Sequence, residues 1–400
     1  MSELRDHIAE SEPELLAFLT DLVEIPSVNG RHPEAPLAAR IIAEAEKFGL
    51  PAELIARDPN RPNAVVRWGE GGRGFAFIGH MDTVAPGDAT RWTSAPFTAA
   101  VRSGRLYGRG AADNKAGIAC GLYTLALVQK LGLLDPQTHQ LILAGVADEE
   151  SGASSELGVR YLLDSGALAA ARGAIYTYTS DIVCVGHRGL LRLQLTARGQ
   201  SVHTGSDEWA AGTAGVNAVT GLAAALLALE QLELPAPAHP AFAHLGCTVT
   251  PGTLFHGGEF ESIVPGKAEA LVDIRLMPGQ DAEEVVTAVR TALDAVCAAR
   301  PGLELEMTVK NRLPGAAIPA EHPLVIVAQQ AARTHTSAPW PIAGAGPANE
   351  GYMLIGAGIP TLPGFGPTGG GAHAPDEWVD IHSLAATVAI YTDIVVNYLK

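Results

Sequence analysis

The chain has 400 residues, 47% of them hydrophobic and 18% charged, so it is too apolar for a disordered protein and long enough for two or three domains. Its formal net charge of −16 argues against binding to nucleic acid or to an anionic membrane surface, because phosphate binding requires clustered basic charge. The four cysteines are far apart and form no Cys-x-x-Cys motif, which excludes a disulfide framework and a zinc knuckle. The N-terminal segment is charged throughout, and no apolar run reaches the roughly 18 residues of a membrane span. We therefore expect a cytoplasmic protein with reduced thiols.

Helical and strand patterns alternate along the first part of the chain. Apolar residues recur at helical spacing in some segments, whereas others are short apolar runs that end in polar or glycine-rich residues. The expected helices cover 15–23, 38–48 and 117–131, and the expected strands cover 64–68, 75–78, 140–146, 174–178 and 182–185. This alternation predicts an α/β domain in which helices cover a mixed sheet.

The middle of the chain has a different pattern. Leucines alternate with polar residues over 190–197, as is typical of a half-exposed strand, and an alanine-rich helix follows over 215–232. Further elements are predicted as strands over 248–252, 268–276 and 303–309 and as a helix over 282–299. The order β-α-β-β-α-β predicts a ferredoxin-like domain at 187–311, inserted into a domain built from 1–186 and 312–400.

A histidine and an aspartate follow the strand predicted at 75–78. The sequence there is Gly-His-Met-Asp-Thr-Val, with His80 and Asp82 two positions apart, so both can face the same side. A metal-binding imidazole needs its second nitrogen held, usually by a carboxylate, and Asp82 can help directly or by fixing the loop. A structural histidine is the alternative.

Three consecutive carboxylates follow the strand predicted at 140–146. Asp148, Glu149 and Glu150 would repel one another if they were buried without a cation. A solvated turn at the start of a helix is the alternative, because acidic residues favour a helix N-terminus. Adjacent glutamates also suit a division of labour, in which one binds a metal and the other takes a proton from water.

Two glycine-containing loops add further candidate ligands. Asp113 lies in Asp-Asn-Lys at the start of a predicted helix, and His373 follows three glycines. The sites of α/β sheets form beyond the carboxyl ends of the strands, where these residues would meet His80 and Glu150. Imidazole and carboxylate ligands without thiolates suit Zn²⁺, Co²⁺ or Mn²⁺.

The motifs GHMDTV, GRGAADNKAG, DEESG and GGGAH resemble, as an ordered set, those of the dizinc exopeptidase and aminoacylase family. That family includes acetylornithine deacetylases, succinyl-diaminopimelate desuccinylases and carboxypeptidase G. The resemblance extends from the segment 22–27 nearly to the C-terminus. It implies that the inserted domain is a lid or dimerisation domain and that the chain forms a homodimer through it.

The resemblance also implies roles for the residues that match. His80 binds one of two metal ions and Asp82 orients it, Asp113 bridges both ions, and Glu150 and His373 complete the set of ligands of the second ion. Glu149 is then the general base, which takes a proton from the water that attacks an amide carbonyl and passes it to the leaving nitrogen.

One ligand departs from the family pattern. Members usually carry a glutamate or aspartate, often before a proline, some 25 to 30 residues after the base. This chain has Tyr-Thr-Ser-Asp at 178–181, and Asp181 is the only carboxylate there. We therefore expect Asp181 to be the last ligand of the first metal.

Four further residues match or replace family segments that face substrate. The resemblance implies that His203 stabilises the oxyanion, from the partner subunit or in cis, with a surface histidine as the alternative. Arg275 suits a bidentate grip on a substrate carboxylate, with a salt bridge to Asp273 as the alternative, and Arg188 is a second candidate. Asn349 lies in a segment that differs from the common family form and is a candidate substrate contact.

The sequence thus predicts a dinuclear metal-dependent hydrolase that cleaves the amide bond of an N-acyl amino acid or a small peptide. Zn²⁺ is the expected ion, with Co²⁺ or Mn²⁺ as alternatives. The substrate stays open among acyl amino acids, dipeptides and a lysine-type group on a carrier protein. A metal-binding or ligand-binding protein that has lost catalysis is the alternative from another class, although Glu149 argues against it.

Overall fold

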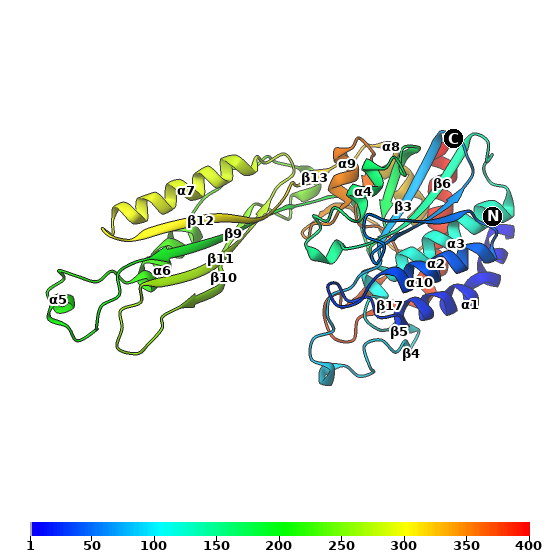
Figure 1. Cartoon of the computed structure of the whole chain (residues 1–400). Coiled ribbons are helices and arrows are strands. Elements are labelled where there is room, and N and C mark those ends of the chain that lie inside the picture. Colours follow the sequence, from blue (N-terminus) through cyan, green and yellow to red (C-terminus); the bar gives the residue numbers. More distant parts are fainter. Residues whose placement is uncertain (1) are drawn as a thin grey trace. The chain divides into compact units, whose positions relative to one another are not determined.

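The computed structural model describes residues 2–400 and divides the chain into two compact units. The major unit contains the chain up to His187 together with Ala317–Ala345 and Asn349–Lys400. The inserted unit contains Arg188–Ala316 and Gly346–Ala348. Figure 1 shows the elements of both units in the colours of the sequence.

The major unit contains helices of very different length and three sheets of short or long strands. Its helices are α1 (Ser2–Glu24), α2 (Ala35–Lys47), α3 (Ala116–Leu131), α4 (Val159–Asp164), α8 (Pro323–His335), α9 (Gly351–Gly356) and α10 (Ile381–Leu399). Its strands are β1 (Ala52–Ile55), β2 (Asn63–Trp68), β3 (Arg73–His80), β4 (Ala100–Arg102), β5 (Arg105–Tyr107), β6 (His139–Val146), β7 (Ala171–Tyr176), β8 (Val183–His187), β14 (Ile342–Ala345), β15 (Thr361–Leu362), β16 (Gly369–Gly370) and β17 (Trp378–Asp380), with β13 (Ala316–Ala317) at the junction of the units.

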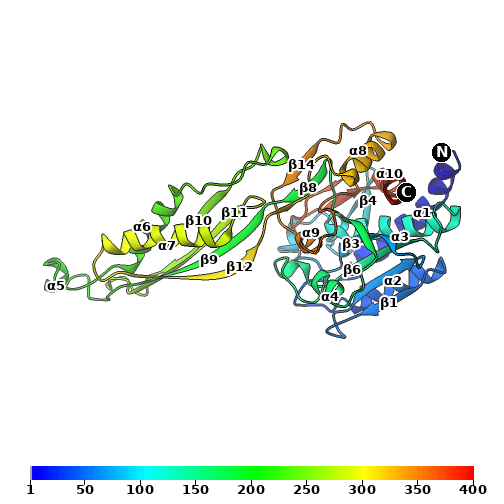
Figure 2. The same cartoon turned by 90° about the horizontal axis from the view of Figure 1, so that it is seen from above.

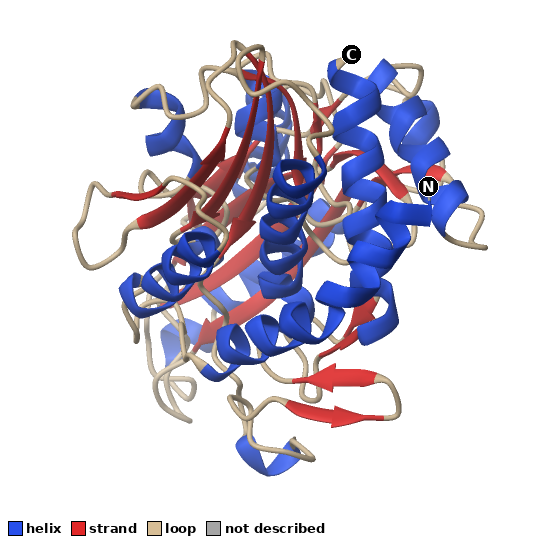
Figure 3. Ribbon diagram, turned by 90° about the vertical axis from the view of Figure 1, so that its right-hand side faces the viewer, coloured by secondary structure: helices blue, strands red, loops and turns tan. Residues whose placement is uncertain are grey.

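A six-stranded mixed sheet is the centre of the major unit, as the sequence predicts. Its strand order is β1-β2-β6-β3-β7-β15, and the four strands from β6 to β15 are parallel. Strand β3 is apolar on both faces because helices cover both of them. Phe77 stacks on Tyr391 of α10, while Ala76 and Ile78 pack in a cluster with residues of α4 and α9. Figure 3 shows helices lying against the strands of this sheet.

The parallel pairing brings the ends of three strands to one edge of the sheet. His80 is the last residue of β3 and pairs with Val146, the last residue of β6, while Ile78 pairs with Tyr176 at the end of β7. The segments after β6 and β7 therefore begin beside His80. A four-stranded antiparallel sheet of order β16-β17-β5-β4 also pairs Gly370 with Trp378, and so folds the loop that contains His373.

The inserted unit has the predicted ferredoxin-like architecture. Its elements are β9 (Gly189–Arg198), α5 (Asp207–Ala210), α6 (Ala218–Glu230), β10 (Thr248–Gly257), β11 (Lys267–Leu276), α7 (Ala282–Ala298) and β12 (Glu304–Leu313). The strand order β12-β9-β11-β10 is antiparallel throughout, and Figure 2 shows α6 and α7 beside this sheet. Alternate leucines of β9 pack against both helices in one core, which explains the period of two in that segment. Strand β12 continues past position 311, where we expected the insertion to end.

Within residues 2–400 we find no helix that combines the length and the apolar character needed to cross a bilayer.

Candidate active site

His80 is fully buried, and both of its ring nitrogens are engaged. Nδ1 lies 2.8 Å from the backbone carbonyl of Asp82 and donates its proton to it, so Nε2 is the nitrogen that faces the acidic residues. Nε2 lies 2.9 Å from Oδ1 of Asp113 and 3.1 Å from the hydroxyl of Tyr178. Burial opposes a charged imidazole, but the hydrogen bond and the charge of Asp113 outweigh it and raise the pKa of His80.

Asp82 orients His80 through its backbone, whereas its carboxylate fixes the next loop. The buried carboxylate accepts the backbone N–H groups of Glu149 and Glu150 at 3.1 and 2.9 Å, and the amide of Asn29 at 2.6 Å. Its nearer oxygen stays 3.7 Å from Nδ1 of His80. Asp82 was expected either to hold His80 directly or to fix the loop, and in the structure its side chain fixes the loop.

The three consecutive acidic residues have different surroundings. Asp148 has a positive φ of 68° and accepts hydrogen bonds from Asn29, Arg61 and Ser155, so it anchors the loop. Glu150 faces His373, and Glu149 is 5% exposed. Burial, together with nearby carboxylates and against the charge of His80, raises the pKa of Glu149 well above its usual range.

Asp113 contacts both histidines with its two oxygens. Oδ1 lies 2.9 Å from His80 and Oδ2 lies 3.3 Å from Nε2 of His373, which is itself 3.2 Å from Oε1 of Glu150. Burial disfavours a charged carboxylate here, but the hydrogen bonds from His373 and His80 outweigh it and hold the pKa of Asp113 well below its usual value. The hydrogen bonds from Asp113 and Glu150 raise the pKa of His373 to about 10.

Glu377 holds the Asp113 loop, a role that the sequence does not predict. Its buried carboxylate accepts the backbone N–H groups of Gly110, Ala112 and Asp113 at 3.1, 2.8 and 2.9 Å and pairs with the buried guanidinium of Arg109. The loop 108–113 is thereby bound to the segment that follows His373. The only sequence signal is an acidic residue close behind the glycine-rich motif.

Glu350 is a second buried acid that the sequence analysis did not select. Its side chain is fully buried, and Oε2 accepts a hydrogen bond from the hydroxyl of Tyr176 at 3.3 Å. Burial, followed by the nearby charge of Asp82, raises the pKa of Glu350 to about 8. The charge of Glu350 also helps to raise the pKa of Glu149.

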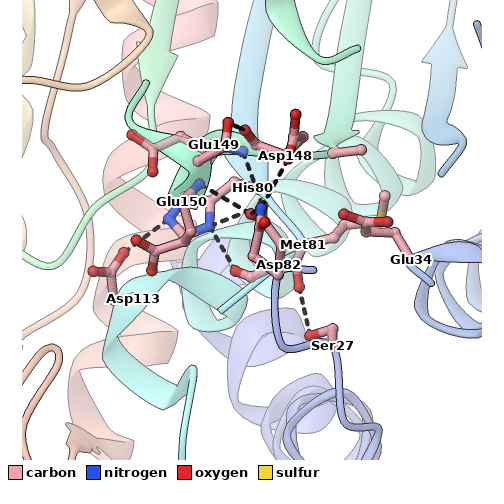
Figure 4. Close-up of polar contacts among 12 residues, drawn as sticks. Ser27, Glu34, His80, Met81, Asp82, Asp113, Asp148, Glu149 and Glu150 are labelled. Atoms are coloured by element: carbon pink, nitrogen blue, oxygen red, sulfur yellow. Dashed lines mark hydrogen bonds and ion pairs between the residues drawn. The ribbon is translucent and has the colours of Figure 1, made fainter. Parts of the chain in front are cut away.

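The donor set fits a metal ion. Ligand atoms of His80, Asp113 and Glu150 all lie within 4.8 Å of one another, and His373 contacts two of these residues. Figure 4 shows Asp113, Glu149 and Glu150 gathered beside His80, beyond the ends of the strands. Nδ1 of His80 is bonded to the backbone, so Nε2 is the nitrogen that faces the carboxylate of Asp113, and imidazole with carboxylates is the donor set of Zn²⁺ and related ions.

Asp181 does not join this group. Its side chain is exposed, and it is not among the residues of 2–400 whose ligand atoms cluster with those of His80 and Asp113. The residue of this segment that reaches His80 is Tyr178, which is only two positions beyond the end of strand β7. The structure thus does not bring Asp181 together with the other expected ligands.

Three of the other candidates lie in the inserted unit. His203 is exposed in a turn, and its Nδ1 accepts the N–H of Gly205 at 2.9 Å, so Nε2 carries the proton and can donate it. Arg275 pairs with Asp273 through Nε at 2.8 Å and Nη2 at 3.4 Å. Arg188 donates to the carbonyl of Gly246 at 3.0 Å.

Asn349 has a structural role. Its amide donates to the carbonyl of Pro363 at 2.7 Å, and its oxygen accepts the N–H of Gly351 at the start of α9 at 2.8 Å. The side chain is 6% exposed, so both ends of the amide serve the fold and the expected substrate contact is not supported.

A family model for "Peptidase family M20/M25/M40" matches residues 76–397. The chain belongs to this family. The predicted dizinc exopeptidase and aminoacylase class is the same family of metal-dependent hydrolases, so that prediction is confirmed.

Two curated relatives in this family match over nearly their whole length. Acetylornithine deacetylase of Vibrio campbellii is 27% identical over 395 residues, which cover 96% of this chain and 99% of the relative. Succinyl-diaminopimelate desuccinylase of Methylorubrum populi is 28% identical over 404 residues, which cover 98% and 100%.

A solved structure shares the M20 fold. The YXEP protein of Bacillus subtilis, titled as a dinuclear metal-binding peptidase of the M20 family, superposes with a TM-score of 0.71 at 16% identity and covers 98% of this chain and 99% of its own. The likeness confirms the predicted fold class for this chain.

Proposed function

We propose that this protein uses two divalent metal ions, Zn²⁺ above all, to hydrolyse the amide bond of an N-acyl amino acid or a small peptide. The observation that supports it is the placement of Glu149, a buried carboxyl beside four potential metal ligands. A protein that only binds metal needs no base there. The printed names of the relatives, a deacetylase and a desuccinylase, favour an acyl amino acid.

The residues divide the work by position. His80, Asp113, Glu150 and His373 would hold the ions, which when bound polarise a carbonyl and activate water. Glu149 takes a proton from the attacking water and returns it to the leaving nitrogen. Asp82 keeps Glu149 in place through the backbone, and burial keeps the carboxyl basic enough to accept the proton.

Two arginines of the inserted unit support a carboxylate in the substrate. Arg188 approaches the hydroxyl of Thr248 at 3.4 Å, and Thr248 pairs with Arg275 between β10 and β11, so the two arginines are neighbours. Burial, followed by the charge of Arg275, lowers the pKa of Arg188. Asp273 holds one edge of Arg275 and fixes its plane. A pair of neighbouring cations of this kind suits a carboxylate anion.

The inserted unit also supports a homodimer in the cytoplasm. Leu254 and Phe255 of edge strand β10 are 54% and 41% exposed. Exposed apolar side chains of this kind are expected on a surface that a second copy of the chain covers. We propose that His203 donates its Nε2 proton to the oxyanion from the partner chain. All four cysteines are free, as expected in a reducing compartment.

The test is hydrolysis of a panel of N-acetyl and N-succinyl amino acids and dipeptides, with added Zn²⁺ or Co²⁺ and again with a chelator. Glu149→Gln should keep its metal and lose at least ~10²-fold in kcat, the usual scale for a positioned base. Glu156→Gln, on the exposed side of the same loop, is the matched control and should leave kcat unchanged. Full turnover in Glu149→Gln would remove this residue from the mechanism, and silence of the wild type across the panel would favour a protein without catalysis.

A further inference from the structure

The first metal position has an unexpected third side chain, which is a phenol. The hydroxyl of Tyr178 lies 3.1 Å from Nε2 of His80, and Oδ1 of Asp113 lies 2.9 Å from the same nitrogen. Within residues 2–400, Asp181 is exposed and lies outside the group of residues around His80, so it supplies no second carboxylate there.

These separations are close to those of ligand atoms that share one ion. Zinc binds nitrogen and oxygen ligands at roughly 2.0–2.2 Å, so two such atoms in a tetrahedral shell lie about 3.3 to 3.6 Å apart. The phenol oxygen and Oδ1 of Asp113 lie 3.1 and 2.9 Å from Nε2 of His80, so each pair needs to separate by less than about 1 Å to share an ion. The phenol oxygen of tyrosine is an established metal ligand in proteins.

The ring of Tyr178 is held in this position by its neighbours. It stacks on Tyr176 with ring centroids 5.5 Å apart and planes 19° from parallel, and Glu350 accepts the hydroxyl of Tyr176. The N–H of Thr177 donates to the carbonyl of Ile78 at 2.8 Å, which ties this segment to β3. The support lies in the buried interior, so the phenol is fixed before any ion binds.

Close packing of α3 against the same segment depends on Gly117. A Cβ atom at that position would lie 2.2 Å from the carbonyl oxygen of Thr177, so only glycine allows this approach. The backbone next to Tyr178 is therefore confined from both sides.

We propose that the phenol oxygen of Tyr178 is the last protein ligand of the metal position formed by His80 and Asp113, in the place where we expected Asp181. The inference rests on the proposed dinuclear function. A phenol offers one oxygen where a carboxylate offers two, so this position holds its ion less tightly than the one formed by Asp113, Glu150 and His373.

The experiment counts zinc ions per chain by mass spectrometry after equilibration of the full-length protein at a buffered free Zn²⁺ concentration. Tyr178→Phe removes only the oxygen and keeps the ring, and Asp181→Asn is the matched control. We expect two ions in the wild type and in Asp181→Asn and one in Tyr178→Phe. Two ions in Tyr178→Phe, one ion in the wild type, or loss of an ion in Asp181→Asn would each overturn the inference.

A second readout does not depend on the variant folding. The wild type loaded with Cu²⁺ should show a phenolate-to-copper charge-transfer band, and its absence contradicts the assignment of Tyr178. The proposed hydrolytic function and the proposed ligand Tyr178 can be refuted independently, because the number of bound ions is measured without turnover. Two ions that depend on Tyr178 without hydrolysis would refute the function alone, whereas hydrolysis with two ions in Tyr178→Phe would refute this ligand alone.

Discussion

Glu377 accepts the backbone N–H of Asp113 at 2.9 Å, although 264 positions separate the two residues along the chain. The same carboxylate accepts two more N–H groups of that loop and pairs with Arg109. It therefore connects the loop of Asp113 to the loop of His373. Neither residue of this buried ion pair belongs to the candidate metal site, but both determine where two of its residues lie.

We expect Glu377→Gln to destabilise the protein and weaken its metal binding. The substitution leaves the guanidinium of Arg109 buried without its counter-charge, a loss of roughly 3–5 kcal/mol. Thermal unfolding and zinc titration measure the two effects. Asp376→Asn, at the neighbouring and more exposed position, should preserve metal affinity. Wild-type affinity in Glu377→Gln would show that the Asp113 loop keeps its position without this carboxylate.

Asp82→Asn should weaken metal binding by roughly 10- to 100-fold, the usual range for residues that position ligands. The amide cannot accept the N–H groups of Glu149 and Glu150 with both of its polar atoms, so the loop loosens. Competition with a chelator measures the affinity. Asp88→Asn is the control, since Asp88 also accepts a backbone N–H but is exposed, and its hydrogen bonds stay within its own turn, with Thr90. Equal affinities in both variants would assign the loop geometry to other contacts.

Glu350 should make the metal-free protein less stable as the pH rises. Its pKa is raised from 4.5 to about 8 in the fold, so the protonated form is favoured there. This contribution to the free energy of unfolding is fully present below about 4.5 and is lost as the pH rises towards 8, with about 1.4 kcal/mol for each pKa unit. The difference in Tm between Glu350→Gln and the wild type should therefore shift in favour of the variant from pH 5 to pH 8.5. Glu321→Gln, at an exposed position, should show a constant difference. A constant difference for Glu350→Gln as well would contradict the prediction.

Mixed dimers test whether His203 acts across the interface. Subunits with His203→Ala and subunits with Glu149→Ala should each be inactive, and mixing them should restore activity. Random exchange makes half of the dimers mixed, each with one complete site, so roughly a quarter of wild-type activity is expected. No recovery after verified exchange would place His203 in its own subunit's reaction or outside the mechanism.

The sequence predicts the residues at the strand ends because their positions follow from local periodicity. His80 and Glu150 come directly after buried strands, and parallel pairing alone brings these ends together. Asp181, which the structure leaves exposed and outside the group, was expected because only carboxylates were considered in its segment. Tyr176 and Tyr178 are two positions apart, as His80 and Asp82 are, so the same alternation predicts that both tyrosine rings lie on one side of the segment. Their rings stack in the structure, as that alternation predicts.

Glu377 and Glu350 are residues whose roles the sequence does not predict. Their importance comes from contacts with residues far along the chain, and neither periodicity nor spacing reports such contacts. Arg275 is an intermediate case. Its strand and its partner Asp273 follow from the sequence, but the neighbouring charge of Arg188 is visible only in three dimensions.

The contact between Glu377 and the Asp113 loop can form only late in the synthesis of the chain. His80, Asp113 and Glu150 leave the ribosome long before His373 and Glu377, and the whole inserted unit is made between them. A nascent chain that has passed residue 316 already contains these three residues of the candidate site, but has neither His373 nor the carboxylate that holds the Asp113 loop. The complete arrangement can thus form only after Glu377 has been made.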